Sequence, residues 1–234
     1  MSERWFEGPL LGFDTETTGV VVDRDRIIQA ALVSGTGATQ VPGSETASVW
    51  LIDPGVPIPP GATRVHGITD EQVKSEGRGP EEALAEVAAA LRGAVEGGVP
   101  VVAFRAGFDC TMLSYELERY GIAQPEWHRM AIVDPSVLDK RVDRYRKGKR
   151  TLGATSAHYG VPHGEAHSAA GDAAATVALA RAIGAMYPEV GDVTAQELHK
   201  SQELWHAEDA ASLEAYFRRK GREEAVERRW PLCR

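Results

Sequence analysis

The sequence predicts an α/β fold with a mixed five-stranded sheet flanked by helices. Five apolar runs are typical of strands, at 10–13, 27–33, 49–52, 100–104 and 130–133. The first three follow one another directly, whereas helical patterns lie between or after the later ones. That order favours a sheet with both antiparallel and parallel neighbours and with helices on its faces.

The clearest helix begins at Pro80, which suits the first turn of a helix because it has no N–H to leave unpaired. Two acidic residues follow it, and the glycine pair at 97–98 ends the pattern. Its apolar face recurs at Leu84, Val87, Ala88, Leu91 and Val95.

The pattern changes after Pro188 to a polar helical stretch that carries its apolar residues on one side. They are Trp205, Leu213, Tyr216 and Phe217. We therefore expect one domain over residues 1–190 and a C-terminal helical extension over 191–234.

Composition excludes several classes of protein. The chain is 43% hydrophobic and 26% charged, which is ordinary for a soluble domain. It has no apolar run long enough to span a membrane, and its start lacks the apolar segment of a secretory signal, so we expect a cytoplasmic protein. Two cysteines, Cys110 and Cys233, are too few for a disulfide framework.

The charge is distributed unevenly. The net charge is −8, yet residues 139–150 hold seven basic and two acidic side chains, a local charge of +5. A solvated loop is one interpretation of this basic strip. The other is a surface for phosphates, which proteins bind through Lys and Arg.

The segment LLGFDTETTG, residues 10–19, places two acids at the end of an apolar strand. Residues i and i+2 of a strand point to the same face, so Asp14 and Glu16 project together. Neighbouring carboxylates repel each other unless a positive charge neutralises them. Mg²⁺ and Mn²⁺ prefer such oxygen ligands, although acids and threonines are also common in ordinary turns.

Two further acids begin helices and fall on the inward side. Leu113, Leu117 and Tyr120 share a helical stripe with Asp109, and Thr176, Leu179, Ile183 and Met186 share one with Asp172. An acid at a helix start normally faces outward as a cap or dipole partner. An inward position favours a metal ligand.

His167 lies five residues before Asp172 and can join the acids only if the chain turns between them. Beside carboxylates and a metal, a neutral imidazole is suited to take a proton from water near pH 7. His158, His163 and His167 lack the spacing of a zinc motif. We expect His128, His199 and His206 at the surface.

Three motifs resemble those of the DEDDh exonuclease family, which includes ribonuclease T and the proofreading subunits of bacterial replicative DNA polymerases. They are GFDTETTG at 12–19, FD at 108–109 before a helix, and HSAAGD at 167–172. VHGIT at 65–69 is similar to the family loop near the substrate's 3′ end. The histidine spacing is that of the h variant, since the tyrosine variant would have Tyr where Ser168 stands. The resemblance covers about residues 8–187 and implies a ribonuclease H-like fold.

The resemblance implies a chemistry and a set of roles. Asp14, Glu16, Asp109 and Asp172 would bind two Mg²⁺ or Mn²⁺ ions, and His167 would be the general base. The reaction would be 3′-to-5′ hydrolysis that releases nucleoside 5′-monophosphates. The candidate nucleic-acid contacts are Thr15, Thr17 and His66 near the terminal nucleotide, together with Arg105, Phe108, Lys147, Lys149 and Arg150.

One stretch departs from the family pattern. Many relatives have His-Asn-Ala-x-Phe-Asp where this chain has FRAGFD at 104–109. The metal ligand is kept, but an asparagine is replaced by Arg105, which would either bind a phosphate or indicate an altered substrate.

Several functions stay open at this point. A free-standing exonuclease on single-stranded 3′ ends is favoured, with DNA ahead of RNA, because all five catalytic positions are filled. The alternatives are a proofreading or accessory subunit whose C-terminal helix docks a polymerase or closes a homodimer, an RNA-trimming exoribonuclease, and an inactive nucleic-acid-binding module.

Overall fold

The computed structural model describes residues 4–35, 46–162 and 168–234. Its sheet contains β1 (Leu10–Thr17), β2 (Ile27–Gly35), β3 (Thr46–Leu51), β4 (Val101–Val102) and β5 (Ile132–Val133). The strand order is β3-β2-β1-β4-β5. β2 pairs antiparallel with both β1 and β3, whereas β4 pairs parallel with both β1 and β5. The predicted mixed five-stranded sheet is confirmed.

The helices fall into three groups. Between β3 and β5 lie α1 (Pro60–His66), α2 (Asp70–Glu76), α3 (Pro80–Glu96), α4 (Ala106–Arg119) and a short 3₁₀ turn (Trp127–Arg129). After β5 come α5 (Pro135–Val142), α6 (Leu152–His158) and α7 (Ala169–Met186). The chain ends with α8 (Pro188–Gly191) and the long α9 (Ala195–Arg219).

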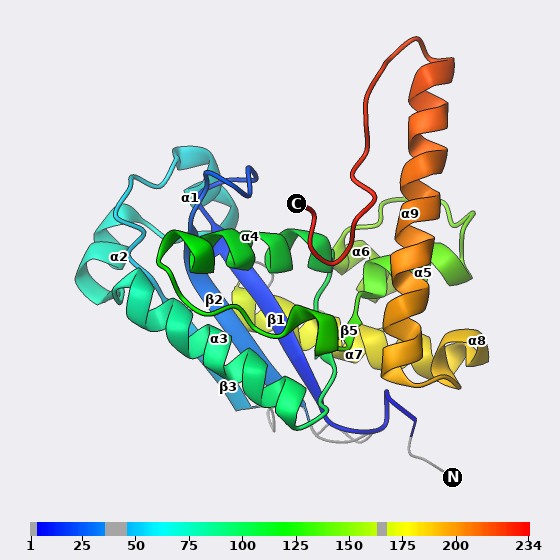
Figure 1. The fold of residues 1–234 in the computed structure, drawn as a ribbon, viewed down its shortest axis with the longest axis horizontal. Coiled ribbons are helices and arrows are strands. Elements are labelled where there is room, and N and C mark those ends of the chain that lie inside the picture. The colour runs from blue at the N-terminus through cyan, green and yellow to red at the C-terminus, as the bar shows by residue number, and fades with distance from the viewer. Residues whose placement is uncertain (1–3, 36–45, 163–167) are drawn as a thin grey trace.

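The sheet lies between two layers of helices. α3 and α4 cover one face, α7 crosses the other, and α5 and α9 stand beside β5 (Figure 1). The core under α3 and α4 includes Phe13, Ile27, Leu84, Leu91 and Leu113, all at most 1% exposed. Full burial of one such side chain contributes about 1.5–3 kcal/mol to folding, so this core fixes the two helices on the sheet.

α9 closes the open edge of the sheet. Gln202 of α9 accepts from the backbone N–H of Asp134 (2.7 Å) and donates to the carbonyl of Ile132 (2.9 Å), just as a neighbouring strand would. The ring Nδ1 of His199 accepts from the backbone N–H of Ile132 at 3.2 Å. His199 is 7% exposed, so the prediction of a surface histidine was wrong: the histidine pairs a backbone group at the edge of β5.

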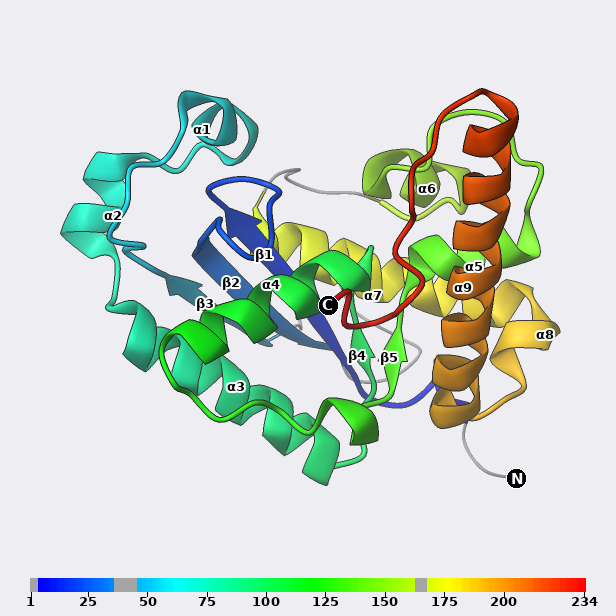
Figure 2. The ribbon, with the colours of Figure 1, turned by 45° about the horizontal axis from the view of Figure 1, so that its top comes forward.

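The chain returns from the end of α9 along that helix and ends on α4 (Figure 2). Trp230 is buried there, with its ring centroid 5.1 Å from that of His199. The backbone N–H of Cys233 donates to the hydroxyl of Thr111 in α4 at 2.8 Å. The last residues therefore tie α9 to the helix that carries Asp109.

Sequence patterns and structure agree best in the long elements. Each of the five strands occurs, and α3 spans Pro80–Glu96 as the pattern indicates. Met186 differs: it is 55% exposed, because it is the last residue of α7 and lies beyond the core. Within the described residues, no helix is both long enough and apolar enough to span a membrane.

Candidate functional site

The first two acids lie at the C-terminal end of β1. Asp14 is paired with Ala31 and Glu16 with Gln29 in the antiparallel ladder to β2. The register shifts between Glu16 and Thr17, so the regular ladder ends directly after the second acid. The carboxylates therefore project from a strand that is fixed on both sides, because β1 is also paired with β4.

A close contact between β1 and α7 brings in the third acid. A Cβ atom on Gly12 would lie 2.6 Å from the carbonyl oxygen of Ala173, so only glycine permits this approach. Gly12 precedes Asp14 by two residues on the same face, and Ala173 is next to Asp172. The N–H of Ala169 also donates to Gln29 of β2 at 3.3 Å, which fixes the start of α7 beside the strand ends.

Asp14, Glu16 and Asp172 converge in the structure. Each offers a carboxylate oxygen, and the three oxygens lie within 4.8 Å of one another. Burial, followed by the charges of Asp109, Glu16 and Asp172, raises the pKa of Asp14 well above its ordinary value. Burial and the charge of Asp172 raise the pKa of Glu16 to about 7. Three crowded carboxylate oxygen donors suit a hard divalent cation, which would relieve their mutual repulsion.

Asp109 takes a separate place at the start of α4. Its Oδ1 accepts from the backbone N–H of Thr15 at 3.0 Å and from the Thr15 hydroxyl at 2.7 Å. Burial raises the pKa of Asp109 to about 7, although these two hydrogen bonds act in the opposite direction. It lies outside the group of three oxygens. Its charge nevertheless acts on Asp14, and its role as a fourth ligand stays a prediction.

Asp134 belongs to the same region and was missed in the sequence. This buried carboxylate accepts from the backbone N–H groups of Arg105 (3.0 Å) and Ala106 (2.9 Å), and from Ser136 at the start of α5 (2.8 Å). It therefore holds the N-terminus of α4, and with it Asp109, against the end of β5. The available signal was the order Asp-Pro-Ser after an apolar run, which is typical of a helix N-cap.

Arg105 has an unusual backbone. Its φ of 63° lies in the left-handed region, which residues other than Gly, Asn and Asp rarely adopt. The family asparagine at this position would tolerate that conformation better than arginine does. The Arg105 side chain is exposed and lines a cavity of about 230 Å³ with Phe108, Trp230 and Cys233.

His167 lies outside the described residues, so its predicted role as general base is untested. The residue after it is described. Ser168 is the N-cap of α7, and its hydroxyl accepts from the N–H of Gly171 at 3.2 Å. The helix that carries Asp172 thus begins two residues after the predicted base, at Ala169.

The three residues predicted to contact the terminal nucleotide each make a hydrogen bond within the chain. The hydroxyl of Thr15 is taken by Asp109, and that of Thr17 donates to the carbonyl of Gly19 at 2.7 Å. His66 ends α1, and its Nδ1 accepts from the N–H of Ile68 at 3.1 Å. Its Nε2 is buried and has no hydrogen-bond partner within the described part of the chain.

The basic strip divides into two kinds of side chain. Arg146 and Arg150 both bind the carboxylate of Asp139, which is 0% exposed. Lys147 and Lys149 are exposed. The structure therefore gives Arg150 a partner inside the protein, and its predicted contact with nucleic acid is not tested.

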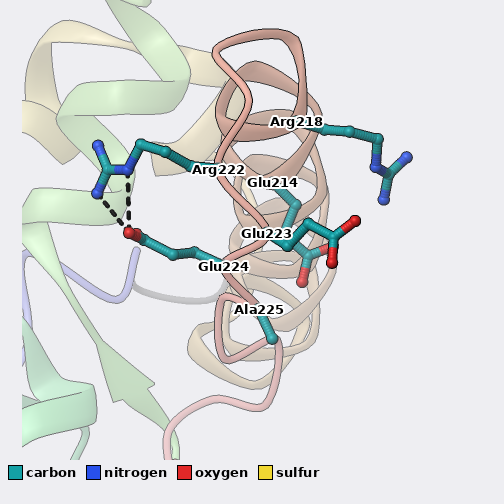
Figure 3. Close-up of a pocket in the computed structure, with 6 residues that line it drawn as sticks. All are labelled: Glu214, Arg218, Arg222, Glu223, Glu224 and Ala225. Atoms are coloured by element: carbon teal, nitrogen blue, oxygen red, sulfur yellow. Dashed lines mark hydrogen bonds and ion pairs between the residues drawn. The ribbon is translucent and has the colours of Figure 1, made fainter.

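A cavity of about 350 Å³ lies elsewhere, at the far end of α9 (Figure 3). It is lined by Glu214, Arg218, Arg222, Glu223, Glu224 and Ala225. Arg222 donates to Glu224 at 3.0 Å, so part of its charge is neutralised within the chain. None of the acids at the end of β1 lines this cavity, and it is therefore separate from the candidate active site.

Comparisons with known proteins agree on one class. A family model described as an exonuclease, of the ribonuclease T type, matches residues 11–180. A DNA polymerase III subunit epsilon-like protein from Rhodobacter capsulatus is 39% identical over 102 residues, which are 43% of this chain and 13% of that protein. An uncharacterised exonuclease, CP81, of Escherichia phage 186 is 36% identical over 72 residues, which are 31% of this chain and 33% of that one. The chain thus matches a third or less of the length of each relative.

Solved structures show the same fold. E. coli exonuclease I in complex with a dT13 oligonucleotide has a TM-score of 0.64 and 20% identity, over 80% of this chain and 43% of that one. The complex of exonuclease I with an SSB C-terminal segment has a TM-score of 0.63 and 18% identity, over 88% and 46% of the two chains. Less than half of each of these solved chains is matched.

Proposed function

Because the chain belongs to the exonuclease family, in its DEDDh branch, we propose that it is a metal-dependent exonuclease that shortens single-stranded nucleic acid from the 3′ end. DNA is the favoured substrate, and the products would be nucleoside 5′-monophosphates. The observation that carries this proposal is the convergence of Asp14, Glu16 and Asp172 at the end of β1.

The acids would bind divalent cations, two in the family pattern, with Asp109 as the fourth ligand. Bound there, Mg²⁺ or Mn²⁺ would lower the pKa of the attacking water and neutralise charge on the departing 3′-oxygen. His167 would accept the proton of that water as its oxygen bonds to phosphorus. The bond from phosphorus to the 3′-oxygen then breaks, and the last nucleotide leaves with a 5′-phosphate.

The ring of His66 has the chemistry to contact the terminal nucleotide. Because its Nδ1 accepts a hydrogen bond, the proton of the neutral ring lies on Nε2, and burial lowers the pKa of His66, which keeps the ring neutral. A buried donor without an acceptor costs about 1–3 kcal/mol. A phosphate or base oxygen of the terminal nucleotide would satisfy this Nε2–H.

The basic strip would bind the phosphates of the strand through Lys147 and Lys149. Each phosphate-binding lysine that is removed reduces the dependence of log affinity on log salt by about 1. Lys147→Gln together with Lys149→Gln should therefore weaken binding more at low salt than at high salt. Equal weakening at all salt concentrations would contradict this role.

The test is digestion of 5′-labelled DNA and RNA, single and double stranded, with Mg²⁺ or Mn²⁺. The proposal predicts a ladder that shortens from the 3′ end, fastest on single-stranded DNA, and no ladder with Asp14→Asn. Immediate release of the labelled 5′ nucleotide, or identical digestion by Asp14→Asn, would contradict it.

A second candidate is a proofreading or accessory subunit. It is favoured by the relative named as polymerase III epsilon-like and by exposed apolar residues on α9, such as Leu204, which is 67% exposed. A polymerase or a second copy of the chain would cover that face. Size-exclusion chromatography with light scattering separates a dimer from a monomer, and co-purification with a replicative polymerase tests the other partner.

A further inference from the structure

The loop between α5 and α6 is held from inside by one buried acid. Asp139 accepts from Nε and Nη2 of Arg146 at 3.0 and 2.9 Å, and it also binds Arg150. The hydroxyl of Tyr159 donates to the same carboxylate at 3.1 Å. A buried carboxylate with three partners is fully compensated, so the two arginines are anchored rather than free.

The same two arginines also fix the backbone of the loop. Nη2 of Arg150 donates to the carbonyls of Asp143 (2.6 Å) and Arg144 (3.2 Å). Nη1 of Arg146 donates to the carbonyl of Lys149 at 3.1 Å. Backbone on both sides of the loop tip is therefore bonded to guanidinium groups, which limits the positions that the tip can take.

The outer side of this loop presents an aromatic ring among cations. Tyr145 is 89% exposed, and Arg144, Lys147 and Lys149, which lie near it in the sequence, are exposed as well. Over the described ranges no ion pair involves these three cations, and no ring contact involves Tyr145. The two inner arginines are bonded to Asp139, whereas the three outer cations have no ion-pair partner within the described ranges.

This combination is the chemistry of single-strand binding. Cations follow the phosphates, and an aromatic ring stacks on a base of any sequence. Because the backbone of the loop is already held in place, little backbone freedom is lost when a base stacks on the ring. An acidic protein partner would need the cations but not an exposed ring with a free face.

The loop lies away from the acids. In both ribbon views it is on the α9 side of the molecule, and the end of β1 is on the other side, with α6 between them (Figures 1 and 2). A strand with its 3′ end at the acids could therefore meet this loop only at nucleotides further upstream.

We infer that Tyr145 is an upstream base-stacking site for single-stranded nucleic acid, with Arg144, Lys147 and Lys149 on the flanking phosphates. The inference rests on the proposed function for the direction of the strand. Phosphate binding by the basic strip depends on charge alone. Stacking on Tyr145 would add one position in the nucleic-acid strand at which the base itself contributes to affinity.

The test is an abasic scan. Oligonucleotides of one length, each lacking the base at a single position counted from the 3′ end, are titrated against the Asp14→Asn variant so that cleavage plays no part. Stacking of one base contributes about 1–3 kcal/mol, which corresponds to roughly 5- to 150-fold in affinity. One upstream position should show this loss in the Asp14→Asn protein and show no loss once Tyr145→Ala is added.

The controls separate stacking from other causes. Tyr145→Phe should keep the pattern of the scan, since the ring is retained. Tyr216 is also exposed but lies on α9, away from this loop, so the Tyr216→Ala variant should bind the oligonucleotide like the parent protein. Parental affinity of Tyr145→Ala for the intact oligonucleotide, or a scan of unchanged shape, would overturn the inference. Failure of the digestion test with a positive scan would reject the nuclease and keep the binding site.

Discussion

Thr15 donates two hydrogen bonds to one oxygen of Asp109, which is 94 residues away along the chain. Thr15 lies between Asp14 and Glu16 in β1, so the strand that carries these two acids also positions Asp109 of α4. Three elements from distant parts of the sequence meet at this point, because α7 approaches the same strand at Gly12.

The first prediction concerns the hydroxyl of Thr15. Thr15→Val removes one of the two bonds that oppose the rise in the pKa of Asp109, so this pKa should rise above its present value of about 7. The acid side of the pH–rate profile should then shift to higher pH, whereas Thr15→Ser should keep the parental profile. Identical profiles for Val and Ser would show that the hydroxyl has no such effect.

The second prediction concerns Gly12. Gly12→Ala places a methyl group against the backbone of α7, and such overpacking costs about 1–3 kcal/mol. Because α7 must move away, Asp172 should separate from Asp14 and the affinity for Mn²⁺ should fall together with the melting temperature. Gly93→Ala, at an open position of α3, should be neutral or stabilising. Unchanged Mn²⁺ affinity in Gly12→Ala would contradict this view of the packing.

The third prediction is a pH dependence of stability. The pKa of Glu16 is about 7 in the folded protein and near its ordinary 4.5 in the unfolded chain. Between these values the folded state binds more protons, so the free energy of unfolding should fall as pH rises from about 4.5 through 7. Urea unfolding in EDTA at about pH 5.5 and 8 measures this, and Mn²⁺ should restore stability at the higher pH.

Two variants check the assignment to Glu16. Glu16→Gln should make the dependence shallower without abolishing it, since the amide does not titrate but Asp109, with a pKa of about 7, still does. Glu86→Gln should leave it intact, because hydrogen bonds from Arg78 and Trp50 keep the pKa of Glu86 at about 2 and its charge constant over this range. A steeper fall in Glu16→Gln than in the parent protein would refute the assignment.

The fourth prediction concerns the edge of the sheet. Gln202→Leu leaves the N–H of Asp134 and the carbonyl of Ile132 without their present partner. Each unpaired buried group costs about 1–3 kcal/mol, so chemical denaturation should show a large loss. Leu204→Ala, on the exposed side of the same helix, should change stability by no more than about 0.5 kcal/mol. Equal losses in both variants would mean that α9 does not pair with β5 as described.

The sequence predicted the elements that bury periodic apolar faces. β1, β2 and α3 show this periodicity over enough residues to stand out. α1 and α2 have only seven residues each, and α1 has no buried residue. Their sequences therefore lack the periodic apolar face from which a helix is predicted. The acids were found because each lies where a strand ends or a helix begins.

The hydrogen-bond and ion-pair partners of buried polar side chains were harder to predict than the helices and strands that carry them. Asp134 and Asp139 are buried acids at or within short helices, where an acid usually acts as a cap or faces solvent. Their partners are backbone groups of α4 in one case and arginines of a following loop in the other, and neither pairing follows from periodicity. His199 was placed at the surface for the same reason, since its partner in β5 is 67 residues away.

Titration calorimetry of Mn²⁺ into the metal-free protein at about pH 7.5 tests the central claim, that acids of β1 and α7 form one cation site. The account predicts saturable binding that is at least about 100-fold weaker in Asp14→Asn and in Asp172→Asn, because loss of an outer partner alone costs roughly 10- to 100-fold. Asp23→Asn, at an exposed acid, should bind like wild type. Equal uptake by wild type and by both site variants would contradict the account.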